Sequence, residues 1–148
     1  NGAERMLANK EIAASMHGIN YNIHDRSHLM RAAQEGIAFS FRYGIDILKQ
    51  VGIQTHVIKA GHANMYLSPL FRTAVATINN SMIELYDTDG SIGAARGAGI
   101  GCGIYKTPAE AFETLRRIDV AEPDLKNQQA YADAYETWKQ HLQTALNN

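Results

Sequence analysis

A short segment between an expected strand and an expected helix carries the residues best suited to bind a ligand. It follows an apolar run that ends at Ala60, and it reads Gly61, His62, Ala63 and Asn64. In α/β proteins, ligands bind in the loops that leave the carboxyl ends of strands. Small residues let a flat ligand or a phosphate approach the backbone, and an asparagine amide can bond a ribose or a base edge. This segment is therefore the first candidate site, with an ordinary strand-to-helix turn as the alternative.

Two other motifs have the residue types of metal sites but not the full pattern. His24 and His28 are four residues apart, as metal ligands on a helix can be, yet no third ligand stands near them in sequence. We expect them to be surface or helix-capping residues. Residues 87–90 lack the third acid and the closing glutamate of a calcium loop, so they predict a turn in which Asp89 or Ser91 caps the next helix. The sequence therefore predicts no metal site and assigns no catalytic residue.

The stretch 91–105 is rich in small residues, with glycine repeated at four-residue spacing in Gly93, Gly97 and Gly101. Glycine in a helix costs about 0.5–1 kcal/mol relative to alanine. We expect that cost to be offset by a neighbouring backbone packed closely against this face. The only cysteine, Cys102, lies in the same stretch, and we expect it to be buried and inert.

Length and composition limit the class of protein. The chain has 148 residues, 45% of them hydrophobic and 20% charged, with a net charge of −1 at pH 7. These values favour one folded domain and argue against general disorder and against a nucleic-acid partner. The longest weakly polar stretch, 92–105, contains Arg96 and is shorter than the roughly 17 residues of a membrane span. One cysteine and no apolar leader favour a cytoplasmic location, and the lack of an initiator methionine suggests a piece of a longer protein.

The hydrophobic pattern predicts strands that alternate with helices. Short strands are expected at 19–23, 56–60 and 82–86, and helices at 27–52, from Pro69, at 91–105, from Pro108 and after Pro123. A stripe of large apolar residues on the last helix predicts core or docking surface. This order favours an α/β domain with a mostly parallel sheet flanked by helices.

Several segments also match, in order, motifs of one protein family. Residues 1–6 are similar to a "GER-T-P" segment, and residues 14–38 follow a signature that ends in an "RA-x-x-EG" helix. Residues 58–64 fall where the family has a "GGGA" adenosine motif, although Ala60, Gly61 and His62 replace the glycine triplet. Residues 68–72 resemble "S-P-L-W-R", residues 89–103 resemble "LGAA-x-x-A-G", and Tyr131, Tyr135 and Trp138 resemble a closing "Y-x-x-Y-x-x-L" helix. Together they resemble the FGGY carbohydrate kinases, and within them the xylulokinases.

The resemblance implies an actin/hexokinase-like fold of two ribonuclease H-like domains, with ATP, Mg²⁺ and a sugar in the cleft between them. It implies that residues 1–148 are most of the C-terminal, nucleotide-binding domain. The phosphate loop, the sugar contacts and the catalytic aspartate of the family lie in the other domain, so this piece alone is expected to be inactive. The implied nucleotide-binding residues are Gly61, His62, Ala63 and Asn64.

The implied reaction is phosphorylation of D-xylulose to D-xylulose 5-phosphate by ATP. A kinase for another pentulose or for glycerol, a non-catalytic actin-like nucleotide-binding module, and a small isolated binding domain stay open as alternatives. The resemblance also implies that two sheet strands are missing from this piece. Unpaired strand edges invite pairing with another chain. We therefore expect the piece to form a homo-oligomer or to exchange strands.

Overall fold

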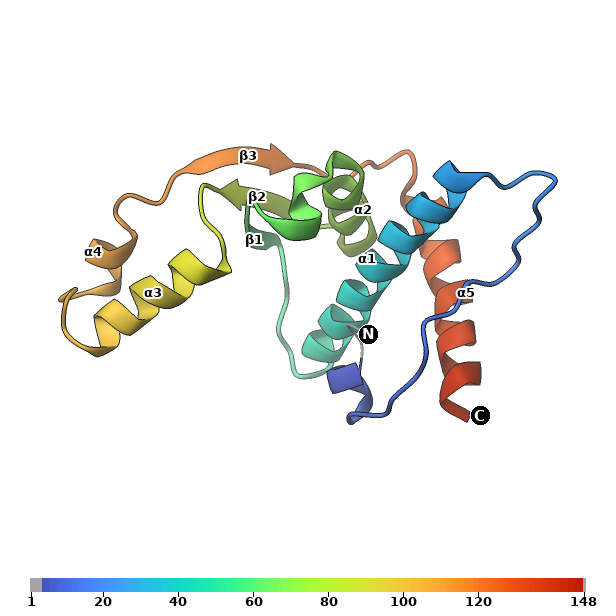
Figure 1. The fold of residues 1–148 in the computed structure, drawn as a ribbon, viewed down its shortest axis with the longest axis horizontal. Helices are drawn as coiled ribbons and strands as arrows, with labels where there is room; N and C mark the ends of the chain where they lie inside the picture. The colour runs from blue at the N-terminus through green and yellow to red at the C-terminus, as the bar shows by residue number, and fades with distance from the viewer. Residues whose placement is uncertain (1–3, 148) are drawn as a thin grey trace.

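The computed structural model describes residues 4–147, so the motif match at residues 1–6 lies partly outside the described residues. Three short strands form one sheet, and helices lie around it (Figure 1). The elements, in chain order, are η1 (Glu4–Leu7), α1 (Arg26–Gln50), β1 (Val57–Gly61), η2 (Asn64–Leu67), α2 (Pro69–Asn79), β2 (Met82–Tyr86), α3 (Gly90–Gly101), α4 (Pro108–Phe112), β3 (Arg117–Ala121) and α5 (Gln128–Asn147).

The sheet has the order β1-β2-β3 and is mixed. Strands β1 and β2 run parallel, with Val57 opposite Met82 and Gly61 opposite Tyr86. Strand β3 runs antiparallel to β2. The expected α/β class is confirmed, but the expectation of a mostly parallel sheet holds for only one of the two strand pairs.

The expected strand at 19–23 is wrong. These residues form a turn in which the backbone N–H groups of Ile23 and His24 both donate to the Asn20 carbonyl, at 3.1 and 2.8 Å. The Asn20 side chain also accepts from the Asn22 N–H at 3.0 Å. These local bonds satisfy the backbone without a partner strand, as asparagine side chains in turns commonly do.

A third strand instead lies at Arg117–Ala121, where the sequence interpretation had placed no strand. Its charged first residue pairs across the sheet, because Arg117 Nη1 lies 2.6 Å from Glu84 Oε1 on β2. Cross-strand charge pairs stabilise antiparallel neighbours modestly. The sequence interpretation missed this strand because it lies between two helices with strong start signals and because its alternation is short and polar.

Side chains cap the N-termini of α1 and α2, and the sequence predicted one of these two caps correctly. Helix α2 begins as expected: the Ser68 Oγ accepts from the Phe71 N–H and Pro69 occupies the first turn. The N-cap of α1 lies two residues before the expected one, because Asp25 rather than Ser27 accepts from the N–H groups of Ser27 and His28. The His28 side chain completes a capping box with the Asp25 N–H.

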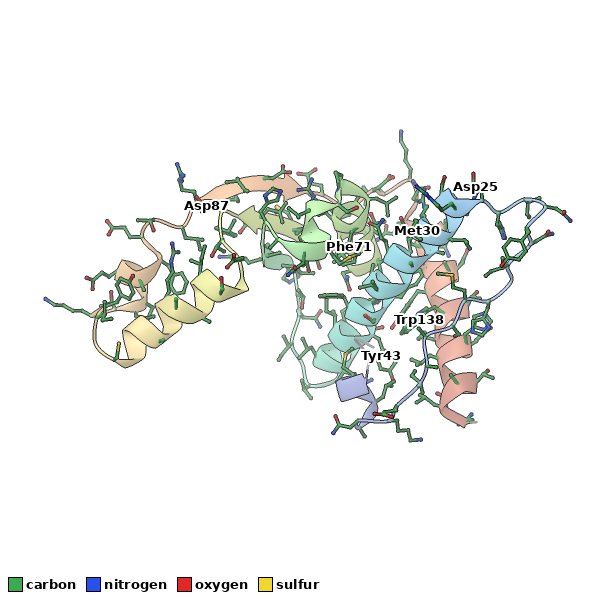
Figure 2. All side chains as sticks on the ribbon, in the orientation of Figure 1. Asp25, Met30, Tyr43, Phe71, Asp87 and Trp138 are labelled. Atoms are coloured by element: carbon green, nitrogen blue, oxygen red, sulfur yellow. The ribbon has the colours of Figure 1, made fainter. Side chains whose placement is uncertain are left out.

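The core lies between α2, the sheet, α1 and α5. Phe71 and Val75 of α2 and Ile83 and Leu85 of β2 are completely buried. The apolar stripe on α5 packs against α1, where Trp138 lies near the helix (Figure 2). Of the two expected roles of this stripe, core or docking surface, the structure shows core, since Phe39 of α1 contacts the rings of Tyr135 and Trp138.

Helices α3 and α4 lie to one side of this core (Figure 1). A Cβ added at Gly93, Gly97 or Gly101 would meet no heavy atom within 4 Å, so the expected close backbone packing on this face is wrong. Among the glycines of α3, only Gly99 is closely packed: a Cβ there would lie 2.7 Å from the Tyr105 ring. The expectation of a buried Cys102 is also wrong, because that residue is exposed.

Candidate functional site

The loops that follow β1 and β2 meet at the ends of their strands. The His62 N–H donates to the Tyr86 carbonyl at 2.9 Å, which extends the pairing one residue beyond Gly61. A Cβ on Gly61 would lie 2.5 Å from the carbonyl oxygen of Thr88, closer than any side-chain carbon can approach. Glycine is therefore required here, and its absence of a side chain brings the two loops into contact.

The chain turns sharply after this contact. The Ala63 N–H donates back to the Gly61 carbonyl at 2.8 Å. Asn64 then adopts a φ of 52°, in the left-handed region that asparagine tolerates better than most residues. The turn leads into η2, where the Tyr66 N–H donates to Ala63 at 3.1 Å. These bonds fix the backbone of the segment that the sequence selected.

A cavity of about 270 Å³ opens beside this turn. Three of the four predicted binding residues, Gly61, Ala63 and Asn64, line it, whereas His62 is not among its lining residues. The structure therefore brings most of the candidate segment to one hollow. The complete lining consists of Phe41, Gly61, Ala63, Asn64, Met65, Tyr66, Phe71, Asp89 and Gly90.

Aromatic side chains from three elements form one wall of the cavity. Tyr66 of η2 lies edge-on to Phe71 of α2, with ring centroids 5.4 Å apart, and edge-on to Phe41 of α1 at 6.3 Å. Edge-to-face contacts stabilise such a cluster. Burial raises the pKa of the Tyr66 hydroxyl, so this group stays neutral. The sequence analysis missed this wall because its members are far apart in the chain.

The loop after β2 contributes the one charged residue in the described lining, Asp89. Its Oδ1 atom accepts from the Ser91 hydroxyl at 2.6 Å and from the Ile92 N–H at 2.9 Å, which caps α3. These hydrogen bonds hold the pKa of the Asp89 carboxyl below its ordinary value, and the bond from the Ser91 hydroxyl has the largest effect. The sequence had identified Asp89 only as a cap. Asp89 lies three residues after the end of β2, in the kind of loop where α/β proteins bind ligands.

A neighbouring aspartate fixes the same loop from the other side. Asp87 accepts from the Arg116 N–H at 2.7 Å and from Arg116 Nε at 3.1 Å (Figure 2 labels Asp87). The backbone bond is the main cause that holds the pKa of Asp87 below its ordinary value. The loop is thus tied to the segment before β3, although Asp87 itself does not line the cavity.

A second hollow, of about 450 Å³, lies among α1, α2 and α5. Most of its polar groups already have protein partners: Tyr135 donates to Asp46 at 2.8 Å, and Tyr131 donates to Glu35 at 3.0 Å. Thr77 donates to the Thr73 carbonyl. These groups form a structural network between helices, so the first cavity is the stronger candidate site.

The two histidines of the weak metal motif act in turns and caps. His28 belongs to the capping box of α1, and His24 Nδ1 accepts from the Asn20 N–H at 3.1 Å. Among residues 4–147, no group of three or more histidine, cysteine, aspartate or glutamate residues is placed to hold a metal ion. Within the same residues, none of the helices combines the length and the apolar character that a membrane crossing requires.

Comparisons with known proteins identify the relatives of this chain. No protein-family model matches it. The "L-xylulose/3-keto-L-gulonate kinase" of Escherichia coli is 29% identical over 94% of the chain, and the "Xylulose kinase" of Haemophilus influenzae is 30% identical over 94%. The chain spans only 28% and 29% of the length of these two relatives.

Solved structures agree with the sequence relatives. The crystal structure of Plasmodium falciparum glycerol kinase with ADP matches with a TM-score of 0.69 and 26% identity, over 92% of this chain and 27% of that one. Crystal structures of xylulose and gluconate kinases share the fold, with TM-scores of 0.66–0.71. The resemblance to the FGGY carbohydrate kinases and the actin/hexokinase-like fold that it implied are confirmed.

Proposed function

We propose that this relative of the FGGY carbohydrate kinases forms the nucleotide-binding, C-terminal part of an ATP-dependent sugar kinase. The observation that carries the proposal is the cavity at the ends of β1 and β2. The segment that the family resemblance assigned to adenosine contributes Gly61, Ala63 and Asn64 to its lining. A nucleotide site at that position agrees with the rule that ligands of open α/β sheets bind outside the carboxyl ends of the strands.

The residues of the cavity suit a nucleoside. The aromatic wall of Phe41, Tyr66 and Phe71 offers apolar surface to a flat base. Gly61 projects no side chain into the cavity, so a ligand can approach its backbone closely. The Asn64 amide can donate to and accept from a base edge or a ribose hydroxyl. His62 stays in the proposal as a neighbour of the site rather than as part of its wall.

In such a kinase, catalysis consists mainly of positioning the nucleotide and the sugar and of neutralising charge on the phosphates. ATP supplies the transferred phosphoryl group. The described residues do not form a Mg²⁺ site of their own, and we assign no catalytic residue to this chain. Its role in the reaction is to hold the nucleoside end of ATP. The acceptor of the hydroxyl proton and the sugar contacts belong to the rest of the kinase.

We propose D-xylulose as the sugar, because the relatives of this chain include proteins named xylulose kinase from two further bacteria, Bacillus subtilis and Lactococcus lactis. The second candidate is glycerol, which a "Glycerol kinase 5" of Gallus gallus favours at 30% identity over 82% of the chain. The residues that would separate these sugars are not among those of the cavity.

A coupled assay of ADP release on the full protein that carries this chain tests the proposal. D-xylulose, L-xylulose, D-ribulose, L-ribulose and glycerol would be compared at equal concentration. We expect rapid, sugar-dependent ADP release with D-xylulose and little with the others. Rapid turnover with glycerol alone would show that the substrate is glycerol rather than D-xylulose, and would still support the proposed kinase activity. No turnover with any acceptor, together with no binding of ADP, would refute the proposal.

A further inference from the structure

The geometry points to Asp89 as the residue that recognises the sugar hydroxyls of the bound nucleoside, in a cavity that takes the nucleoside and leaves its phosphates outside. This inference rests on the proposed function, because it specifies which part of the nucleotide each side of the cavity meets. It adds a specificity-determining residue from the β2 side to the candidate segment on the β1 side.

The size and lining of the cavity fit a nucleoside better than a whole nucleoside triphosphate. Its volume of about 270 Å³ lies just below the roughly 300–1,000 Å³ that pockets for complete drug-sized ligands have. Phe41, Met65, Tyr66 and Phe71 supply apolar surface. Polar groups come from Asn64, after β1, and from Asp89, after β2.

The charge in the cavity opposes a phosphate. Asp89 is the one charged residue that lines it in the described part of the chain, and its carboxylate repels anions. The N-terminus of α3 would otherwise attract a phosphate through its free N–H groups. Asp89 already occupies that position, because its Oδ1 accepts from the Ile92 N–H at 2.9 Å. The phosphates of a bound nucleotide therefore extend away from this wall.

The same carboxylate is suited to hydroxyl groups. An ionised carboxylate only accepts hydrogen bonds, and ribose hydroxyls can donate them. Oδ1 of Asp89 is held by Ser91 and Ile92, while Oδ2 forms no hydrogen bond with the rest of residues 4–147. This cavity-lining side chain thus keeps one carboxylate oxygen free to accept a further hydrogen bond. An acidic residue after a strand recognises ribose in the same way in dinucleotide-binding folds.

Calorimetric binding of adenosine and 2′,3′-dideoxyadenosine to the full protein that carries this chain tests the inference. We expect the wild type to bind adenosine about tenfold more tightly, because the dideoxy compound lacks the hydroxyl donors. In Asp89→Asn the preference should fall to about twofold or less, with binding of the dideoxy compound unchanged. Asparagine caps helices as well as aspartate does, so α3 keeps its start. Asp89→Ser, which also retains a cap, serves as the second variant.

The matched control is Asp133→Asn, which removes an exposed carboxylate on α5 that does not line the cavity. This variant should keep the full preference for adenosine. Excess inorganic phosphate should leave adenosine binding unchanged, and competition by phosphate would contradict an anion-repelling cavity. Equal binding of both nucleosides by the wild type, or an unchanged preference in both Asp89 variants, would overturn the inference alone. Failure of the wild type to bind either adenosine or ADP would instead refute the proposed function.

Discussion

Gly61 and Thr88 are in direct backbone contact, such that a Cβ on Gly61 would lie 2.5 Å from the Thr88 carbonyl oxygen. This contact joins the loop after β1 to the loop after β2, and the cavity lies between these loops and the aromatic wall. The shape of the candidate site therefore depends on one glycine.

Replacing this glycine should separate the two loops. We expect Gly61→Ala to lower the free energy of unfolding by about 1–3 kcal/mol, as overpacking against a rigid backbone atom does. Nucleotide binding should weaken as well. Thermal denaturation and ADP titration measure the two effects. Gly93→Ala is the control, because a Cβ there meets no atom within 4 Å and the change should stabilise α3 by about 0.5–1 kcal/mol. Equal stability of the Gly61 variant and the wild type would contradict the contact.

Asn64 can be tested without straining the backbone. Its φ of 52° is readily adopted by glycine, so Asn64→Gly removes the amide and keeps the turn. We expect the KM for ATP to rise by the equivalent of about 1–3 kcal/mol, with the KM for the sugar unchanged. Asn80→Gly is the matched control, since Asn80 has a φ of 48° and does not line the cavity. An unchanged KM for ATP would remove Asn64 from the site.

The glycines of α3 should respond in opposite ways. Gly97→Ala should stabilise the protein by about 0.5–1 kcal/mol, because this position is helical and has open space around it. Gly99→Ala should not gain this stability, because the new methyl group would lie 2.7 Å from the Tyr105 ring. Thermal denaturation of the two variants compares them directly. A destabilised Gly97 variant would instead support the close packing that the sequence predicted for this face.

Tyr135 joins α5 to α1 through a buried hydroxyl. It is 5% exposed, and its hydroxyl donates to Asp46 Oδ2 at 2.8 Å, while Arg42 Nε holds Asp46 Oδ1 at 2.7 Å. Tyr135→Phe should lower the free energy of unfolding by about 0.5–1.5 kcal/mol, because Asp46 keeps its arginine partner. Chemical denaturation gives this value. Tyr21→Phe, at a tyrosine that is 82% exposed, should leave stability unchanged. If Tyr135→Phe were as stable as the wild type, the hydroxyl would add nothing to helix packing.

The Asp87–Arg116 contact predicts a pH dependence. The folded pKa of Asp87 lies below its ordinary value of 3.8, mainly because the carboxylate accepts the Arg116 N–H. The contact therefore stabilises the protein above that ordinary value, and the stabilisation is lost as the pH falls through the folded pKa. Asp87→Asn should have a lower Tm than the wild type near neutral pH, and the difference should shrink in acid. A difference in Tm that does not change with pH would contradict an ionic origin.

Elements with strong local signals were predictable from the sequence. The serine–proline pair at 68–69 starts α2, and the apolar run Met82–Tyr86 is a strand, because short-range capping and burial decide both. The pattern at 19–23 failed because side-chain and backbone bonds to Asn20 close a turn before any strand can pair. Strand β3 was missed because it is defined by its pairing with β2, including the contact of Arg117 with Glu84, which alternation in β3 alone does not reveal.

The lining of the candidate cavity was predictable from the sequence only in part. Gly61, Ala63 and Asn64 are close in sequence, so the local pattern of a strand followed by a turn includes all three. All three line the cavity. The rest of the lining comes from α1, α2, later residues of η2 and the β2 loop, which come together only in the folded structure. No local pattern joins Phe41 to Asp89 across nearly fifty positions. This part of the lining could therefore be recognised only in the three-dimensional structure. The expected oligomer formation stays a prediction that the arrangement of one chain does not test.

Hydrogen–deuterium exchange of the full protein, with and without ADP, tests the central claim most directly. The account predicts that ADP slows exchange in two separate segments, residues 60–66 after β1 and residues 87–92 after β2, because both border the cavity. Residues 128–136 of α5, beside the second hollow, should exchange at the same rate in both states. Protection by ADP elsewhere in the protein, with neither of the two loops affected, would contradict the nucleotide site proposed for this chain.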